Sequence, residues 1–291
     1  ESLSDLMLRV SQRFGVSGTA STAMAGVDLA LWDLKGKIYE LPVYSLLGGP
    51  VRESITCYAT GDDLDWAQEL GFTKFKITNP AHYSESDSGV KAVVEHVAWA
   101  REQVGGDHDL MINPAMSFNV EFALRLLAEL RPYNLRWFEE PLVPTDTAGL
   151  AQLRQAAPWV AIATGEDHHG RHAFLDLVES RAVDILQPDL SWGGGITEAI
   201  KVHIIGEAAG LATIPHGGAN DPFGQHFAMA ATESPMAEFW LGSDPGVPLE
   251  ETVKIPGTVV PVNGQVTPSN EPGFGMHFEE SDITDWEEGT K

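Results

Sequence analysis

Short apolar runs recur along the chain, and most end at or just before a polar side chain that could bind a metal or take part in catalysis. If the runs are parallel strands of one barrel, their C-terminal ends open on a single face, which carries the active site in barrel enzymes. The polar side chains would then converge on one pocket. Seven of the eight runs fit this pattern, ending with Lys76, Asn113, Glu139, Glu166, Asp189, His216 and Glu238.

Three of these residues offer oxygen ligands for a metal ion. Asn113, Glu139 and Glu166 follow three consecutive runs, at spacings of 26 and 27 residues. Carboxylate and carbonyl oxygens suit Mg²⁺, which prefers hard ligands in octahedral geometry, whereas a zinc site would favour sulfur. We therefore expect this trio to bind Mg²⁺.

The other four residues could move protons or stabilise charge. Asp189 and His216 follow neighbouring runs, and a carboxylate beside an imidazole fixes its tautomer and makes it a general base. Lys76 could be a second acid or base or an electrostatic clamp. Glu238 could hydrogen-bond a developing enolate if it stays protonated. Taken singly, each could also be an ordinary helix cap or loop residue.

The elements that must position these residues follow an alternating pattern. Amphipathic stretches separate the apolar runs, and such strand–helix alternation favours a parallel sheet with right-handed crossovers. Eight units predict a closed α/β barrel of the TIM type, (β/α)7β or (β/α)8, over residues 51–245. An open doubly wound sheet is the alternative, although no Gly-x-Gly-x-x-Gly follows the first run. The predicted strands are 55–59, 74–77, 109–112, 135–138, 160–163, 184–186, 211–214 and 237–241, and the predicted helices are 21–37, 90–104, 120–130, 148–156, 173–180 and 197–209.

Composition narrows the classes of function. The 291 residues carry a formal net charge of −24, which argues against binding to nucleic acid or to anionic membranes. Cys57 is the single cysteine, so no disulfide forms within the chain, and no apolar run reaches the roughly 20 residues of a membrane span. The first residues lack the basic region of a secretion signal, so we expect a cytoplasmic protein.

Several motifs resemble the mandelate racemase subgroup of the enolase superfamily. Residues 136–142 (Arg-Trp-Phe-Glu-Glu-Pro-Leu) and 164–166 (Thr-Gly-Glu) resemble its metal-ligand strands, and residues 187–189 and 215–217 resemble its Asp–His pair. Residues 27–37 and 46–49 are similar to the helix and turn before its barrel. Within the subgroup, four further segments resemble the L-rhamnonate dehydratases: 58–61, 132–135, 260–264 and 272–275.

The resemblance implies a chemistry for the predicted site. Mg²⁺ would bind the carboxylate of an aldonic acid, and His216 would abstract the proton at C2. The resulting enediolate would be stabilised by Mg²⁺, Lys76 and Glu238. Loss of the 3-hydroxyl, with the same histidine as acid, would give a 2-keto-3-deoxy acid. The resemblance also implies a homo-oligomer that acts on a small acid sugar such as L-rhamnonate.

Three departures from the family pattern leave alternatives open. Asn113 stands where the family usually has aspartate, and Asp167 where the L-rhamnonate enzymes usually have histidine, with His168, His169 and His172 nearby. We expect residues 1–50 to be a helical segment before the barrel, without the family's α+β capping domain. The chain has no initiator methionine, which suggests that it starts partway through a longer product or was processed. Residues 246–291 would then be an irregular β segment without the domain it normally packs on. A racemase or epimerase using Lys76 opposite His216, or a catalytically impaired barrel, is the alternative function.

Overall fold

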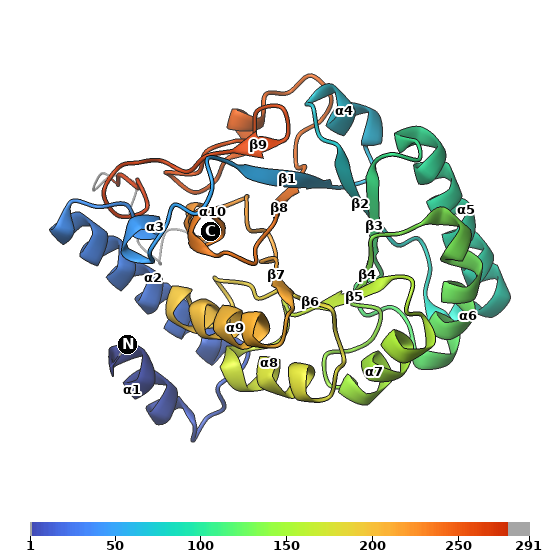
Figure 1. Cartoon of the computed structure of the whole chain (residues 1–291), viewed down its shortest axis with the longest axis horizontal. Coiled ribbons are helices and arrows are strands. Elements are labelled where there is room, and N and C mark those ends of the chain that lie inside the picture. The colour runs from blue at the N-terminus through green and yellow to red at the C-terminus, as the bar shows by residue number, and fades with distance from the viewer. Residues whose placement is uncertain (1, 279–291) are drawn as a thin grey trace, which may run out of the picture.

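Eight parallel strands form a curled sheet around a common axis in the computed structural model, which describes residues 2–278 (Figure 1). The hydrogen-bonded order is β7-β6-β5-β4-β3-β2-β1-β8, so the last barrel strand lies beside the first. Between β7 and β8 the described residues form no ladder, and a hydrogen bond of 2.8 Å from the Thr213 amide to the Glu233 carbonyl lies there instead. The strands are β1 (Ile55–Thr60), β2 (Lys74–Thr78), β3 (Asp109–Asn113), β4 (Trp137–Glu139), β5 (Ala161–Thr164), β6 (Ile185–Leu186), β7 (Ala212–Thr213) and β8 (Ala237–Trp240).

A helix follows each strand from β1 to β7, and in the described part of the chain the only helical element after β8 is a short 3₁₀ turn, η3 (Leu249–Thr252). The predicted α/β barrel is therefore confirmed in its (β/α)7β form. The sequence did not predict α4 or α10, since α4 is very short and α10 contains proline and glycine. The helices are α4 (Leu64–Glu69), α5 (Ser86–Val104), α6 (Val120–Leu130), α7 (Thr147–Ala156), α8 (Gly170–Glu179), α9 (Ile196–Ala208) and α10 (Pro222–Ala230).

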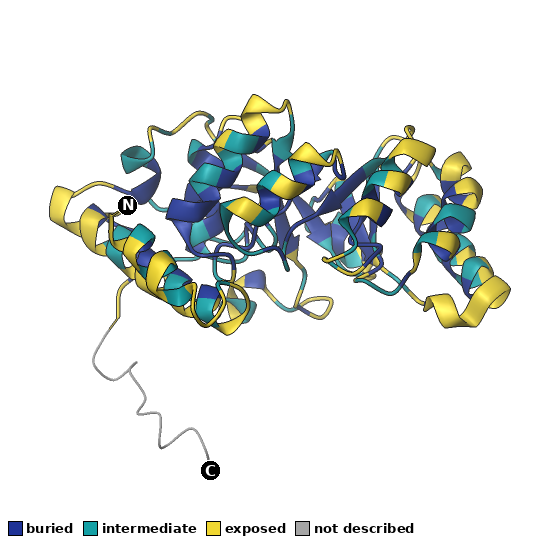
Figure 2. Cartoon of the chain, turned by 90° about the horizontal axis from the view of Figure 1, so that it is seen from below, coloured by how far each residue is buried: buried dark blue, intermediate teal, exposed yellow. Residues whose placement is uncertain are grey.

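The strands are buried on both faces, because helices cover the outside and side chains fill the inside. Figure 2 shows the strands mostly in the colour of buried residues. Side chains such as Phe75 and Ile77 point outward into the large core beneath the helices. A smaller cluster that includes Tyr58, Met111 and Trp137 fills the interior of the barrel. Strand residues two apart share a face, so the residue two positions after each interior apolar one also points inward. The polar side chains at the ends of the strands, here called the polar layer, therefore lie directly above the apolar cluster inside the barrel.

Three helices precede the barrel: α1 (Ser2–Ser11), α2 (Thr19–Tyr39) and α3 (Val43–Leu46). The predicted helix 21–37 lies within α2. Figure 1 shows α2 running beside α9, and two hydrogen bonds of 2.9 Å join them. Thr197 donates its amide to Asp28 Oδ2, and its hydroxyl accepts from Trp32 Nε1. The front helices are thus attached to the barrel wall.

The C-terminal segment up to residue 278 is packed, and the prediction that it would have no packing partner was wrong. Strand β9 (Gln265–Val266) pairs antiparallel with the start of β1. Further on, the Phe274 amide donates to Asp33 Oδ1 at 2.9 Å, and its ring packs against Phe223 of α10. Close approach requires glycine at Gly36, where a Cβ would lie 2.5 Å from the Gly273 Cα. Helices α2 and α10 therefore provide the packing surface that the sequence analysis had assigned to another domain.

Replacing Phe274 with alanine should lower the free energy of unfolding by about 3–5 kcal/mol, because a fully buried aromatic ring would leave a cavity. Urea denaturation followed by circular dichroism would measure the change. The matched control is Phe278→Ala, at a side chain that is 56% exposed, where we expect a change within about 0.5 kcal/mol. Equal stability of Phe274→Ala and the unsubstituted chain would show that this segment does not contribute to the fold.

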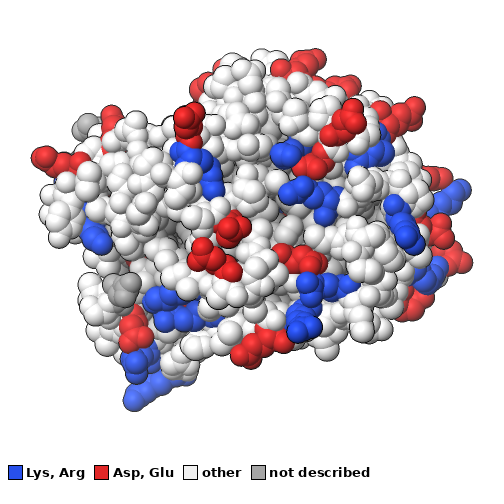
Figure 3. Space-filling view, viewed as in Figure 1, with Lys and Arg blue, Asp and Glu red and all other residues white. Residues whose placement is uncertain are grey.

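Charge on one face of the molecule is mixed in spite of the acidic composition. On the face seen in Figure 3, Lys and Arg side chains lie among the Asp and Glu side chains. None of the helices in the described residues is both long enough and apolar enough to cross a membrane.

Candidate active site

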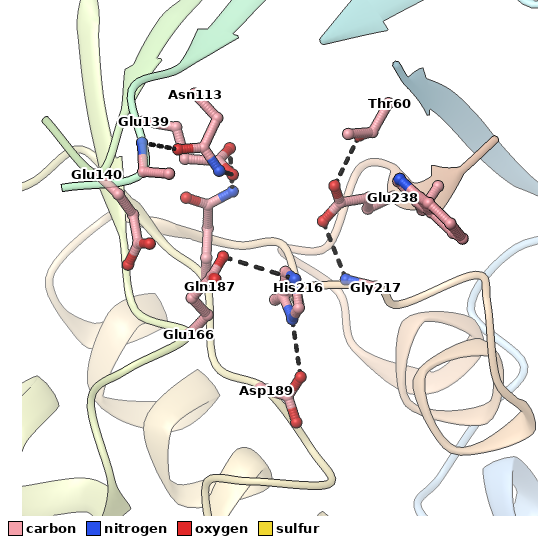
Figure 4. A network of polar contacts seen from close by, with 12 residues as sticks. Thr60, Asn113, Glu139, Glu140, Glu166, Gln187, Asp189, His216, Gly217 and Glu238 are labelled. Carbon is pink, nitrogen blue, oxygen red and sulfur yellow. Dashed lines mark hydrogen bonds and ion pairs between the residues drawn. The ribbon is translucent and has the colours of Figure 1, made fainter. Parts of the chain in front are cut away.

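The polar layer surrounds a cavity at the C-terminal ends of the strands. Its volume is about 490 Å³, within the usual range for small-molecule sites. Figure 4 shows side chains from several strands directed toward this opening. Of the seven predicted site residues, six line the cavity, and Glu139 lies just beneath it, bonded to Lys76 and Asn113. The cavity is lined by Lys76, Asn113, Glu166, Asp189, His216 and Glu238, together with Trp192, Trp240 and Lys254 among others.

Lys76 lies at the centre of the polar layer and is 1% exposed. Its ammonium pairs with Glu139 Oε1 and, at 2.7 Å, with Glu238 Oε1. Burial alone would lower the pKa of Lys76, but the two carboxylates outweigh it and hold that pKa well above its ordinary value. The ammonium is therefore a fixed positive charge between two buried carboxylates.

The Glu139 carboxylate is fully engaged in hydrogen bonds, and Asn113 makes two. Glu139 Oε2 accepts from the Trp137 indole and the Gln187 amide, each at 2.8 Å, while Oε1 accepts from Asn113 Nδ2 at 3.0 Å in addition to Lys76. Asn113 Oδ1 accepts from the Ala115 amide at 2.7 Å. An ionised carboxylate has about four acceptor positions, and Glu139 uses four.

A second group of carboxylates lies on the other side of the mouth. Glu140, Glu166 and Asp167 each place one oxygen within 4.8 Å of the others. Burial and neighbouring negative charges raise the pKa of Glu140 to about 7 and that of Glu166 to about 8. Three carboxylates at this separation repel one another, and a divalent cation between them would relieve that repulsion.

The predicted pair of Asp189 and His216 forms. His216 Nδ1 lies 2.7 Å from Asp189 Oδ2, and the other Asp189 oxygen accepts from the amides of Ser191 and Trp192. The free nitrogen, Nε2, faces Glu166 Oε2 at 3.5 Å. Burial disfavours the charged ring, but the bond to Asp189 and the nearby carboxylates outweigh burial and raise the pKa of His216 to about 10. The aspartate thus fixes one nitrogen and leaves the other facing the cavity.

The predicted role of Glu238, a hydrogen bond donated to a developing enolate, requires a protonated carboxyl. Burial raises its pKa, but Lys76 and His216 outweigh this effect and lower the pKa to about 2, so the side chain is ionised at neutral pH. Its oxygens accept from the Thr60 hydroxyl at 2.6 Å and from the Gly217 amide at 2.9 Å. Glu238 therefore anchors Lys76 and the backbone next to His216.

In the described part of the chain, the three histidines after Glu166 do not gather around a common point. The only cluster there of three or more His, Cys, Asp or Glu side chains that could hold a metal ion is formed by Glu140, Glu166 and Asp167. His168 is buried against Phe174, whereas His172 is exposed on α8. The residues that sequence reasoning missed are Glu140, Gln187, Trp137 and Thr60. For Gln187, Trp137 and Thr60 the signal was present, since strand residues two apart point the same way.

The family follows from two sequence matches. Residues 62–282 match the model described as enolase C-terminal domain-like, and residues 2–48 match the N-terminal domain of mandelate racemase and muconate lactonizing enzyme. The chain therefore belongs to the enolase superfamily, in the group of these two enzymes. The helical segment expected to precede the barrel without a capping domain is thus matched as part of the N-terminal domain.

Individual relatives are similar over nearly the whole chain. The chain is 39% identical to L-rhamnonate dehydratase of Saccharopolyspora erythraea over 282 residues, which is 96% of this chain and 72% of the relative. Rhamnonate dehydratase from Gibberella zeae, whose crystal structure contains Mg, is 34% identical with a TM-score of 0.90 over 96% of this chain and 70% of that one. The 3,6-anhydro-D-galactonate cycloisomerase from Zobellia galactanivorans is 27% identical, with a TM-score of 0.84 over 96% and 79%.

Proposed function

We propose that this protein is a Mg²⁺-dependent hydro-lyase that removes water from an acid sugar, with L-rhamnonate as the first substrate to test. The observation that carries the proposal is the Asp189–His216 pair, whose free nitrogen faces a carboxylate cluster across the mouth of the barrel. Relatives that carry the name L-rhamnonate dehydratase support the choice of substrate.

The chain's own residues fit a divalent cation. The donors around Glu166 are carboxylate oxygens, as Mg²⁺ prefers, and Glu140 Oε2 is buried without a hydrogen-bond donor among the described residues. The predicted ligands Asn113, Glu139 and Glu166 would hold the ion, with the carboxylates of Glu140 and Asp167 beside Glu166. When bound, Mg²⁺ would neutralise the substrate carboxylate and the negative charge that develops on it as the adjacent proton leaves.

His216 in its neutral form would take the proton from C2, next to the substrate carboxylate. The neighbouring carboxylates raise the pKa of the ring, and a cation held by them would lower it again. Nδ1 is held by Asp189, so Nε2 is the atom that receives the proton. The electron pair of the C2–H bond first delocalises into the carboxylate, giving an enediolate, and then forms the C2–C3 double bond as the C3–OH bond breaks. The departing hydroxyl takes the proton from His216 and leaves as water, and the enol product rearranges to the 2-keto-3-deoxy acid. The same nitrogen accepts the proton from C2 and returns it to the departing hydroxyl, so one imidazole serves as both base and acid.

Lys76 would contribute fixed positive charge beneath the substrate. Its ammonium is buried between two carboxylates, and this placement weakens the alternative of a racemase or epimerase, which needs a second base on the opposite face. At the rim, Trp192 and Trp240 would contact the carbon chain of the sugar, and Lys254 would attract its negative charge.

A panel of C5 and C6 aldonic acids, incubated with the protein and Mg²⁺, would test the proposal by assay for 2-keto-3-deoxy acids. We expect a product from L-rhamnonate that is lost when EDTA is added. Absence of product from every acid would refute the proposed function. Exchange of the C2 proton with deuterated solvent, without elimination, would instead support a racemase or epimerase.

A further inference from the structure

A second hollow lies at the opposite end of the barrel from the candidate active site. Its volume is about 730 Å³, larger than that of the active-site cavity. Ala161 and Asp184 line it, at the N-terminal ends of β5 and β6. Glu166 and Asp189 follow the C-terminal ends of the same two strands. The hollow therefore lies outside the chemistry proposed above, and its lining needs an explanation of its own.

One arginine in the wall of this hollow has no acidic partner in the described part of the chain. Arg154 donates from Nε and Nη2 to Asp184 Oδ1, each at 2.8 Å, and Asp184 Oδ2 accepts from the Ile162 amide at 2.9 Å, so the charges of this pair cancel. Arg181 lines the hollow with an exposed side chain, and no carboxylate of the described residues pairs with it. Acidic residues outnumber basic ones by 42 to 18 in this protein, so an unpaired arginine is unexpected.

The backbone at Arg181 does not account for the choice of residue. Arg181 lies just beyond the end of α8 and has a left-handed φ of 53°. Helices often end on a residue in this conformation, and glycine is favoured there because a Cβ is crowded. The Arg181 and Ala182 amides donate to the carbonyls of Val178 and Leu177, each at 3.0 Å, and these backbone bonds hold the turn. Glycine would therefore satisfy the turn better, and the guanidinium is not needed for it.

The hollow also presents an aromatic surface. Trp159 is 39% exposed and lines the hollow together with Pro158. The guanidinium of Arg131 lies over the indole ring, 4.9 Å from the ring centre, so it steadies the ring and adds positive charge beside it. An aromatic ring and a net positive charge thus meet in one hollow of an otherwise acidic protein.

We propose that this hollow binds a small organic anion that carries a planar ring, with the anionic group on Arg181 and the ring against Trp159. A guanidinium binds carboxylate and phosphate oxygens through paired N–H donors, and an indole stacks on flat rings. The volume lies within the usual range for small-molecule sites. A mononucleotide and an aromatic carboxylate share this chemistry, so both kinds of anion serve as probes.

Calorimetric titration of the full chain with AMP and, separately, with 2-naphthoate tests the proposal. We expect at least one of the two to bind with a Kd below about 1 mM. The uncharged analogues, adenosine and 2-naphthylmethanol, should bind at least about tenfold more weakly, because they cannot pair with a guanidinium. Arg181→Gln should weaken binding of the anion at least about tenfold, and Trp159→Ala should do the same through loss of stacking.

The matched controls are Arg13→Gln, at an exposed position after α1, and Trp99→Ala, at a tryptophan on α5 that is also 39% exposed. Both should leave the affinity unchanged, and circular dichroism melts would show that each variant is folded. Failure of both anions to bind, equal binding of the uncharged analogues, or full affinity in Arg181→Gln or Trp159→Ala would overturn the site. The titrations contain neither acid sugar nor Mg²⁺, so their outcome is independent of the proposed function.

Discussion

Replacing His216 with asparagine is expected to lower kcat for dehydration by about a hundred- to ten-thousand-fold, the usual contribution of a general acid–base group. Asparagine can keep the bond to Asp189, but it cannot accept a proton at the position of Nε2. The same variant should also lose exchange of the C2 proton with deuterated solvent, because exchange needs abstraction alone. Steady-state kinetics and proton NMR in deuterated buffer would measure the two effects.

The matched control for this variant is His277→Asn, at a side chain that is 78% exposed and paired with Glu271 outside the barrel. Its rate and its exchange should equal those of the unsubstituted chain. Elimination that persists in His216→Asn at more than about a tenth of the normal rate would mean that another group takes the proton. Such a result would also remove the main argument for the proposed mechanism.

The polar layer could be predicted because strand geometry is local. Interior apolar residues such as Met111, Trp137 and Ile214 are followed two positions later by Asn113, Glu139 and His216. Period-two alternation places both members of each pair on the inner face, and parallel strands bring their ends to one mouth. The sequence alone therefore predicts which side chains meet, even though they are far apart along the chain.

The same alternation rule explains why Glu140 was missed. As the neighbour of Glu139, it should point away from the interior. The strand ends at Glu139, however, and the left-handed backbone of the next residue turns its side chain back toward the mouth. Non-glycine residues rarely adopt this conformation, and the contacts that hold it come from segments distant in sequence. The packing of Phe274 on Phe223 is likewise long-range, so the sequence pattern alone could not predict it.

Replacing Lys76 with methionine should lower the free energy of unfolding by about 3–5 kcal/mol, as when one member of a buried ion pair is removed. Methionine fills a similar volume, so the loss of stability would come from the missing charge and not from altered packing. Glu139 and Glu238 would remain buried without the ammonium between them, although both keep other hydrogen-bond donors. Urea denaturation in EDTA would measure the change without a contribution from bound metal.

Lys91→Met provides the control for Lys76→Met, because the Lys91 side chain is 76% exposed and its pair with Glu95 is a surface contact along one helix. Such pairs contribute about 0.3–0.5 kcal/mol, so this variant should be nearly as stable as the unsubstituted chain. The destabilisation of Lys76→Met should also shrink as the pH falls far enough to protonate Glu238, whose pKa Lys76 lowers to about 2, since a neutral carboxyl no longer needs the ammonium. If the destabilisation stayed constant at low pH, it would come from packing. Lys76 would then not be the positive charge that holds two anions at the base of the site.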